Sequence, residues 1–127
     1  MAVYLVCAGL LGLLGVALAF NVGRVRGQKK IFLGDGGDKE LITAMRVQAN
    51  FIETVPLGLI LIGLLAGSAS ATVAVLSLAL LVARLLHAPG MLGYLSYGRP
   101  AGATLSTLVL AVAAIGVGLS GLGIKLP

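Results

Sequence analysis

The chain alternates between long apolar runs and short polar connections. Four runs, at about residues 2–24, 40–66, 71–87 and 101–124, are apolar almost throughout. Each is close to the length of about 20 residues that a helix needs to cross a bilayer. Glycine, proline and charged residues gather between the first two runs and between the last two. The pattern predicts an all-α membrane protein, a bundle of four transmembrane helices forming a single domain over residues 1–127.

The composition supports this class and excludes others. The chain is 59% hydrophobic and only 10% charged, whereas soluble domains have about 25% charged residues. The net charge is +5, but the basic residues lie at the ends of apolar runs and aromatic residues are few. We therefore interpret them as anchors at a membrane face and expect no nucleic-acid partner. A single cysteine, Cys7, excludes an internal disulfide, and no metal site is predicted.

The basic residues also predict an orientation. Arg24, Arg26, Lys29, Lys30 and Lys39 flank the first connection, and Arg84 and Arg99 flank the third. Because loops rich in lysine and arginine stay in the cytoplasm, we expect both basic loops there and both termini outside.

One polar stripe interrupts the second apolar run. Arg46, Asn50 and Glu53 stand at i, i+4 and i+7, so a helix places them on one face. An ionised side chain within a span costs about 2.5–3.5 kcal/mol or more, so these groups need polar partners. One possibility is a structural network between helices, with Glu53 paired to Arg84. The other is a ligand, since several cations and His87 are expected at the same end of the bundle. That set suits a small anionic ligand with carboxylates and an amine.

The motifs resemble those of a known family. The pattern Arg46-x-Gln48-x-Asn50-x-x-Glu53-x-x-Pro56 on the second of four spans resembles the signature of the MAPEG family, the membrane-associated proteins in eicosanoid and glutathione metabolism. Segment 25–32 at the end of the first span, Arg84-x-x-His87 and Arg99-Pro100 add to the likeness. The Gly34-Asp35-Gly36-Gly37 loop is similar to that of the short bacterial branch.

The resemblance implies a homotrimer that binds glutathione between neighbouring subunits near the cytoplasmic face. It places Arg26 and Arg46 at the glutathione carboxylates, and Arg99 beside the sulfur as the catalytic residue. The remaining binding residues that it implies are Gln48, Asn50, Glu53, His87 and Tyr94. Met91 stands where eicosanoid-making members have a tyrosine, so Tyr94 or Tyr97 is the candidate to replace that side chain.

The predicted function is a glutathione-dependent transferase or peroxidase in the bacterial inner membrane. Glutathione would be the co-substrate, and a lipophilic small molecule would reach the site through the lipid bilayer. Two alternatives stay open: a small four-helix multidrug exporter that uses Glu53, and a non-catalytic membrane scaffold with the same fold.

Overall fold

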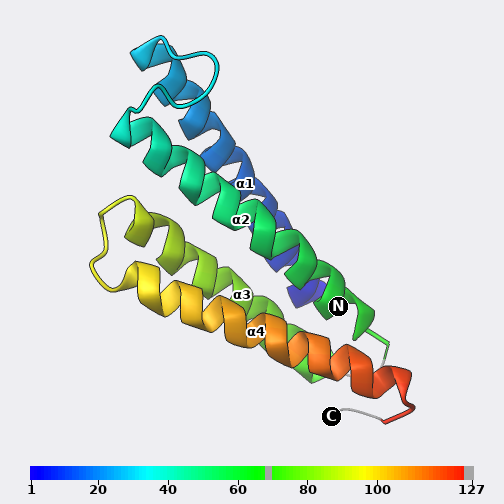
Figure 1. The fold of residues 1–127 in the computed structure, drawn as a ribbon. Coiled ribbons are helices and arrows are strands. Elements are labelled where there is room, and N and C mark those ends of the chain that lie inside the picture. The colour runs from blue at the N-terminus through cyan, green and yellow to red at the C-terminus, as the bar shows by residue number, and fades with distance from the viewer. Residues whose placement is uncertain (68–69, 125–127) are drawn as a thin grey trace.

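The computed structural model describes residues 1–67 and 70–124 and contains four helices in that part of the chain. Two antiparallel hairpins form the bundle (Figure 1). The helices are α1 (Ala2–Lys29), α2 (Lys39–Leu64), α3 (Ser70–Met91) and α4 (Gly98–Gly121). All four are long and apolar enough to cross a membrane, which confirms the predicted fold class.

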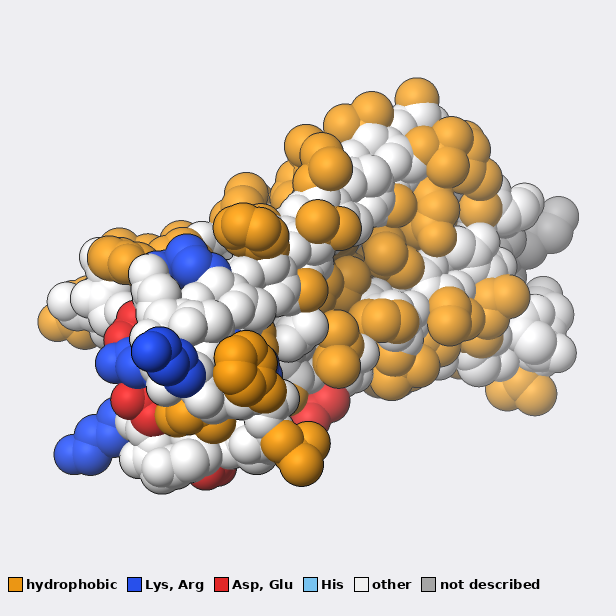
Figure 2. Space-filling view, turned by 90° about the horizontal axis from the view of Figure 1, so that it is seen from above, with side chains coloured by type: hydrophobic (Ala, Val, Ile, Leu, Met, Phe, Trp, Pro, Cys, Tyr) orange, Lys and Arg blue, Asp and Glu red, His pale blue; other side chains and the backbone are white. Residues whose placement is uncertain are grey.

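The charged side chains gather at one end of the bundle. The α1–α2 and α3–α4 loops lie at that end, and the start of α1 and the end of α4 lie at the other (Figure 1). In the space-filling view, most of the blue and red atoms cover this end, whereas the rest of the face is largely orange and white (Figure 2). Large apolar side chains such as Phe20, Leu64 and Leu13 are well exposed along the helices. An apolar outer surface of this kind suits contact with lipid.

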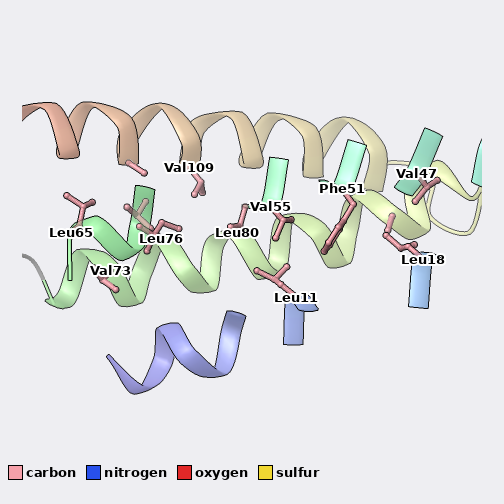
Figure 3. Packing of buried hydrophobic residues seen from close by; sticks show 13 residues of the cluster. Leu11, Leu18, Val47, Phe51, Val55, Leu65, Val73, Leu76, Leu80 and Val109 are labelled. Carbon is pink, nitrogen blue, oxygen red and sulfur yellow. The ribbon is translucent and has the colours of Figure 1, made fainter. Parts of the chain in front are cut away.

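The core runs along the axis between the two hairpins. Leu11 and Leu18 of α1 pack with Phe51 of α2, and the same cluster continues to Leu80 of α3 and Val109 of α4 (Figure 3). Lipid is as apolar as this core, so no hydrophobic driving force brings the helices together in the membrane. Tight van der Waals packing holds them together instead. The cluster therefore fixes how each helix is rotated toward its neighbours.

The closest packing joins α3 to α4, and glycines make it possible. A Cβ on Gly98 would collide with the Leu86 carbonyl oxygen, and one on Gly90 would collide with the Arg99 backbone nitrogen. A Cβ on Gly102 would lie 2.5 Å from the Ala83 carbonyl oxygen. Small residues allow two membrane helices to approach backbone to backbone. These contacts hold the charged ends of α3 and α4 together.

Four helix boundaries differ from the approximate predicted spans by three residues or more. α1 continues to Lys29 rather than residue 24, and α4 runs from Gly98 to Gly121 rather than from 101 to 124. α3 continues through Pro89 to Met91 rather than ending near residue 87, although proline usually disrupts the interior of a helix. The packing of Gly90 against the start of α4 accounts for this continuation.

Asp38 is the N-cap of α2, as its sequence position predicts. Its carboxylate accepts a hydrogen bond from the Leu41 backbone N–H at 2.9 Å and lies 3.4 Å from the Lys29 ammonium. The Leu41 N–H first, and Lys29 after it, hold the pKa of the Asp38 carboxyl below its ordinary value. The cap and the ion pair tie the start of α2 to the end of α1.

Candidate functional site

A cleft of about 520 Å³ opens at the charged end, between α2 and the α3–α4 hairpin. We call it the polar cleft. A volume of that size lies within the range of about 300–1,000 Å³ typical of small-molecule sites. Its lining residues are Ile42, Thr43, Arg46 and Asn50 of α2, His87 and Met91 of α3, and Arg99, Pro100 and Ala103 of α4.

Two guanidinium groups give the polar cleft its charge. Arg46 and Arg99 both line it and both are exposed. Neither side chain forms a hydrogen bond or an ion pair with any residue in the described part of the chain. The lining contains no carboxylate. Two cations with no partner among these residues favour an anionic ligand, and guanidinium groups match carboxylates in geometry.

The first turn of α4 adds to this preference for an anion. Arg99 and Pro100 belong to that turn, which is N-capped by Tyr97 without any side-chain hydrogen bond. Backbone N–H groups at a helix start carry partial positive charge and attract anions. The buried Gly98, packed on the Leu86 carbonyl oxygen, sets the position of this turn against α3.

Asn50 is oriented by an arginine buried in the bundle. The Arg84 Nη1 donates to the Asn50 side-chain oxygen at 2.9 Å and approaches the Asn50 backbone oxygen at 3.5 Å. Arg84 is only 2% exposed, so this contact joins α2 to α3 inside the protein. Because the amide oxygen of Asn50 is occupied, its amide NH₂ is the group left to face a ligand as a donor.

This contact differs from the pairing of Arg84 with Glu53, which was one of the two possibilities that the sequence left open. Among the described residues Arg84 forms no ion pair, and its Nε has no hydrogen-bond partner. Asn50 lies one turn closer to the charged end than Glu53, and its oxygen takes the place of the carboxylate. The physical reason is helix rotation: Asn50 is half-buried on the α3 side of α2, whereas Glu53 is exposed.

His87 and Met91 form the α3 wall of the polar cleft. His87 is 4% exposed, and Gly102 of α4 lies against it: a Cβ on Gly102 would come within 2.6 Å of the His87 Cβ. Met91, one turn further along α3, also lines the cleft. The position expected from the resemblance to hold a tyrosine therefore contributes a flexible apolar side chain here.

The structure thus brings together four of the predicted site residues, namely Arg46, Asn50, His87 and Arg99. Arg26 serves the adjacent loop instead: its Nη1 donates to the carbonyl oxygens of Ile31 at 3.1 Å and Gly34 at 2.7 Å. Its Nη2 also lies 3.4 Å from the Met45 sulfur.

The other three predicted residues lie outside the polar cleft of the subunit. Gln48 is half-exposed and Glu53 is exposed, and neither lines the polar cleft. Tyr94 lines a separate cleft together with Arg24 and Lys39. Tyr97 is 83% exposed and lines neither of these two clefts.

The sequence reasoning missed four lining residues, which are Ile42, Thr43, Pro100 and Ala103. Helical spacing holds a signal for two of them. Thr43 precedes Arg46 by three positions and Ala103 follows Arg99 by four, so each shares a helix face with a predicted residue. Ile42 and Ala103 give the polar cleft an apolar side next to the cations.

Comparison with known proteins assigns the chain to a family. The MAPEG family profile matches residues 4–119, and the chain belongs to that family. It is 34% identical over 111 residues to "Inner membrane protein YecN" of Escherichia coli strain K12, an alignment that covers 84% of this chain and 85% of the relative. The protein of the same name from Escherichia coli O6:H1, strain CFT073, matches to the same extent. The protein is thus a four-helix membrane protein of the MAPEG family.

Proposed function

We propose that the protein is a glutathione-dependent transferase or peroxidase of the bacterial inner membrane, with glutathione bound in the polar cleft. The observation that carries the proposal is a pair of guanidinium groups, Arg46 and Arg99, that have no partner among the described residues and line one cleft without a carboxylate. Glutathione offers both carboxylates for such groups, together with peptide carbonyls for the Asn50 amide. Membership of the MAPEG family and the inner-membrane name of the relatives add support.

The chemistry we propose is activation of the glutathione thiol by Arg99. A free thiol has a pKa of about 8.5, and a neighbouring cation lowers it, so more thiolate is present at neutral pH. The proton leaves to solvent. The thiolate electron pair then forms a carbon–sulfur bond to a lipophilic electrophile, and the leaving group departs with its own bonding pair. The apolar surface beside the cleft, from Ile42 and Ala103, suits such an electrophile arriving from the bilayer.

We further propose that the active form is a homotrimer with its basic loops in the cytoplasm. Gln48 and Glu53 lie outside the polar cleft of their own subunit, on the outer surface of α2. A neighbouring subunit packed there would make these side chains available to glutathione held between the two. The Glu53 carboxylate would then have the ammonium group of glutathione as its partner.

The first test is thermal melting of the purified protein in detergent with increasing glutathione. A ligand that binds only the folded state stabilises it by about 2.7 kcal/mol at 100 times its Kd, so the melting temperature should rise with concentration. Arg46→Ala should remove most of this shift. The Arg46 side chain is exposed and has no hydrogen bond or ion pair within residues 1–67 and 70–124, so the melting temperature without glutathione should not change.

Lys30→Gln is the matched control, since it removes another exposed cation at the same end that lines neither cleft. It should respond to glutathione as the unaltered protein does. Absence of any shift in the unaltered protein at millimolar glutathione would overturn the proposal. If Lys30→Gln loses as much of the glutathione-dependent rise in melting temperature as Arg46→Ala, the effect would depend on general surface charge and not on the polar cleft.

Replacing Arg84 tests whether the protein needs the hydrogen bond of this residue to Asn50, or only the volume of its buried side chain. Arg84→Met keeps most of the side-chain volume but leaves the Asn50 oxygen without its 2.9 Å partner. The buried guanidinium has no carboxylate partner among the described residues, so removing its charge should offset the cost of the unpaired Asn50 oxygen, and the melting temperature should change little. Glutathione affinity should fall about ten-fold, because the Asn50 amide would no longer be oriented to donate its hydrogen bond to the ligand.

Melting curves and glutathione titrations of Arg84→Met and Arg84→Lys provide the measurement. The lysine variant retains a donor for Asn50 and should recover part of the affinity. If Arg84→Met binds glutathione as tightly as the unaltered protein, Arg84 does not orient Asn50 for the ligand.

A further inference from the structure

A second cleft, of about 420 Å³, lies at the charged end between α1, α2 and the α3–α4 loop. We call it the α1–α2 cleft. It shares Thr43 with the polar cleft, but its other lining residues are different. Its polar lining residues are Asn21, Arg24, Lys39, Glu40, Thr43 and Tyr94. None of the glutathione chemistry proposed above uses this cleft.

Arg24 is held in place without losing its charge. Its Nη2 donates to the Asn21 side-chain oxygen at 2.9 Å, and its Nη1 donates to the Gln28 side-chain oxygen at 3.1 Å. Both acceptors are neutral amides on the same helix, so they orient the guanidinium while its positive charge stays uncompensated. The remaining N–H donors of Arg24 are available to a ligand.

The other charges leave an excess of positive charge in the α1–α2 cleft. The Lys39 ammonium has no hydrogen bond or ion pair in the described part of the chain. Glu40 is the one acid in the lining, and the Lys29 ammonium lies 3.0 Å from its carboxylate. Arg24 and Lys39 therefore face the cleft without an anionic partner in the part of the chain that the structure describes, which suits a phosphate ligand.

The rest of the lining is apolar, which favours an amphiphilic ligand. Val25, Ala44 and Leu92 complete the walls, and Tyr94 is 82% exposed. Nearby, the α1–α2 loop exposes Phe32 by 80% and Leu33 by 93%, next to Lys29 and Lys30. Exposed aromatic and aliphatic side chains beside cations are typical of segments lying among lipid headgroups.

We propose that the α1–α2 cleft binds the phosphodiester headgroup of an anionic phospholipid. Arg24 and Lys39 contact the phosphate oxygens, and the Tyr94 hydroxyl donates to the headgroup. The apolar walls accept the upper part of the lipid. Basic pockets between membrane helices are known to take anionic headgroups. This proposal does not depend on glutathione binding, so its test can fail while the proposed function holds, and the reverse.

Native mass spectrometry of the protein in detergent containing either phosphatidylglycerol or phosphatidylcholine tests the site. The unaltered protein should retain phosphatidylglycerol selectively, and less of it as the ionic strength rises. Arg24→Gln and Lys39→Gln should each weaken binding about five-fold and together about 25-fold, as expected for cations close to an anionic headgroup. Both side chains are exposed, and melting curves in phosphatidylcholine establish that the variants fold.

Lys30→Gln is again the matched control, because Lys30 is an exposed cation at the same end that does not line the cleft. It should retain phosphatidylglycerol as the unaltered protein does. An equal loss in Lys30→Gln, or equal retention of the two lipids by the unaltered protein, would overturn the proposal. So would displacement of the lipid by soluble glycerol phosphate at comparable concentration, which would make the ligand a free phosphate ester.

Discussion

Gly102→Ala is expected to destabilise the folded protein by about 3 kcal/mol or more, at the upper end of the usual effect of overpacking. The added Cβ would lie 2.5 Å from the Ala83 carbonyl oxygen and 2.7 Å from the His87 backbone nitrogen. Both are backbone atoms of α3, so no side chain can turn away to make room. The two helices must separate along their closest contact. The melting temperature in detergent measures the loss, and glutathione binding should weaken as well because His87 is displaced.

Gly118→Ala is the control on the same helix. Beyond its own helix turn, a Cβ on Gly118 meets no atom of the described residues within 4 Å. This variant should therefore melt at or above the temperature of the unaltered protein, given the better helix propensity of alanine. If the two variants have the same melting temperature, the close contact between α3 and α4 does not stabilise the charged end of the bundle.

Arg99→Ala should lower kcat for conjugation of a chloronitrobenzene by about 100- to 1,000-fold, the effect typical of losing one group that stabilises a developing anion. Without the guanidinium, the bound thiol should ionise near its ordinary pKa of about 8.5. The activity of the variant should therefore keep rising with pH where that of the unaltered protein has levelled off. The Arg99 side chain is exposed and has no hydrogen bond or ion pair in the described residues, so the fold should be preserved.

A comparison of kcat with glutathione binding decides the role of Arg99. The glutathione-dependent rise in melting temperature should persist in Arg99→Ala, since Arg46 and Asn50 remain on the cleft. Arg99→Lys should recover part of the turnover, because it restores a positive charge. Unchanged turnover in Arg99→Ala would remove Arg99 from the catalytic step, and a complete loss of binding would make it a binding residue instead.

Much of the fold could be predicted because its signals are local. Mean hydropathy over about 20 residues marks a membrane span whatever packs beside it, and Asp38 before Lys39-Glu40 marks a helix start through its own hydrogen bond to Leu41. The boundary at Pro89 could not be predicted in this way. The helix continues there because Gly90 packs on the start of α4, a contact between segments that are separated by the whole third connection.

Four of the nine residues that line the polar cleft could also be predicted from the sequence. Arg46, Asn50, His87 and Arg99 were identified from helical spacing and from the motif, and they line one cleft. The partner of Arg84 was not, because i, i+4 and i+7 spacing places Asn50 and Glu53 on the same broad face. Only the rotation of α2 against α3 decides which of the two oxygens Arg84 meets.

Hydropathy and charge act through each segment alone, so they are enough to predict a four-helix membrane protein with its charges at one end. Which side chains share a cleft depends on how the helices pack. Tyr94 follows Met91 by only three positions, yet Met91 lines the polar cleft and Tyr94 the α1–α2 cleft. That division depends on where α3 ends and on the glycine contacts that hold α3 to α4. Such contacts join residues far apart in the chain, so no local pattern reveals them.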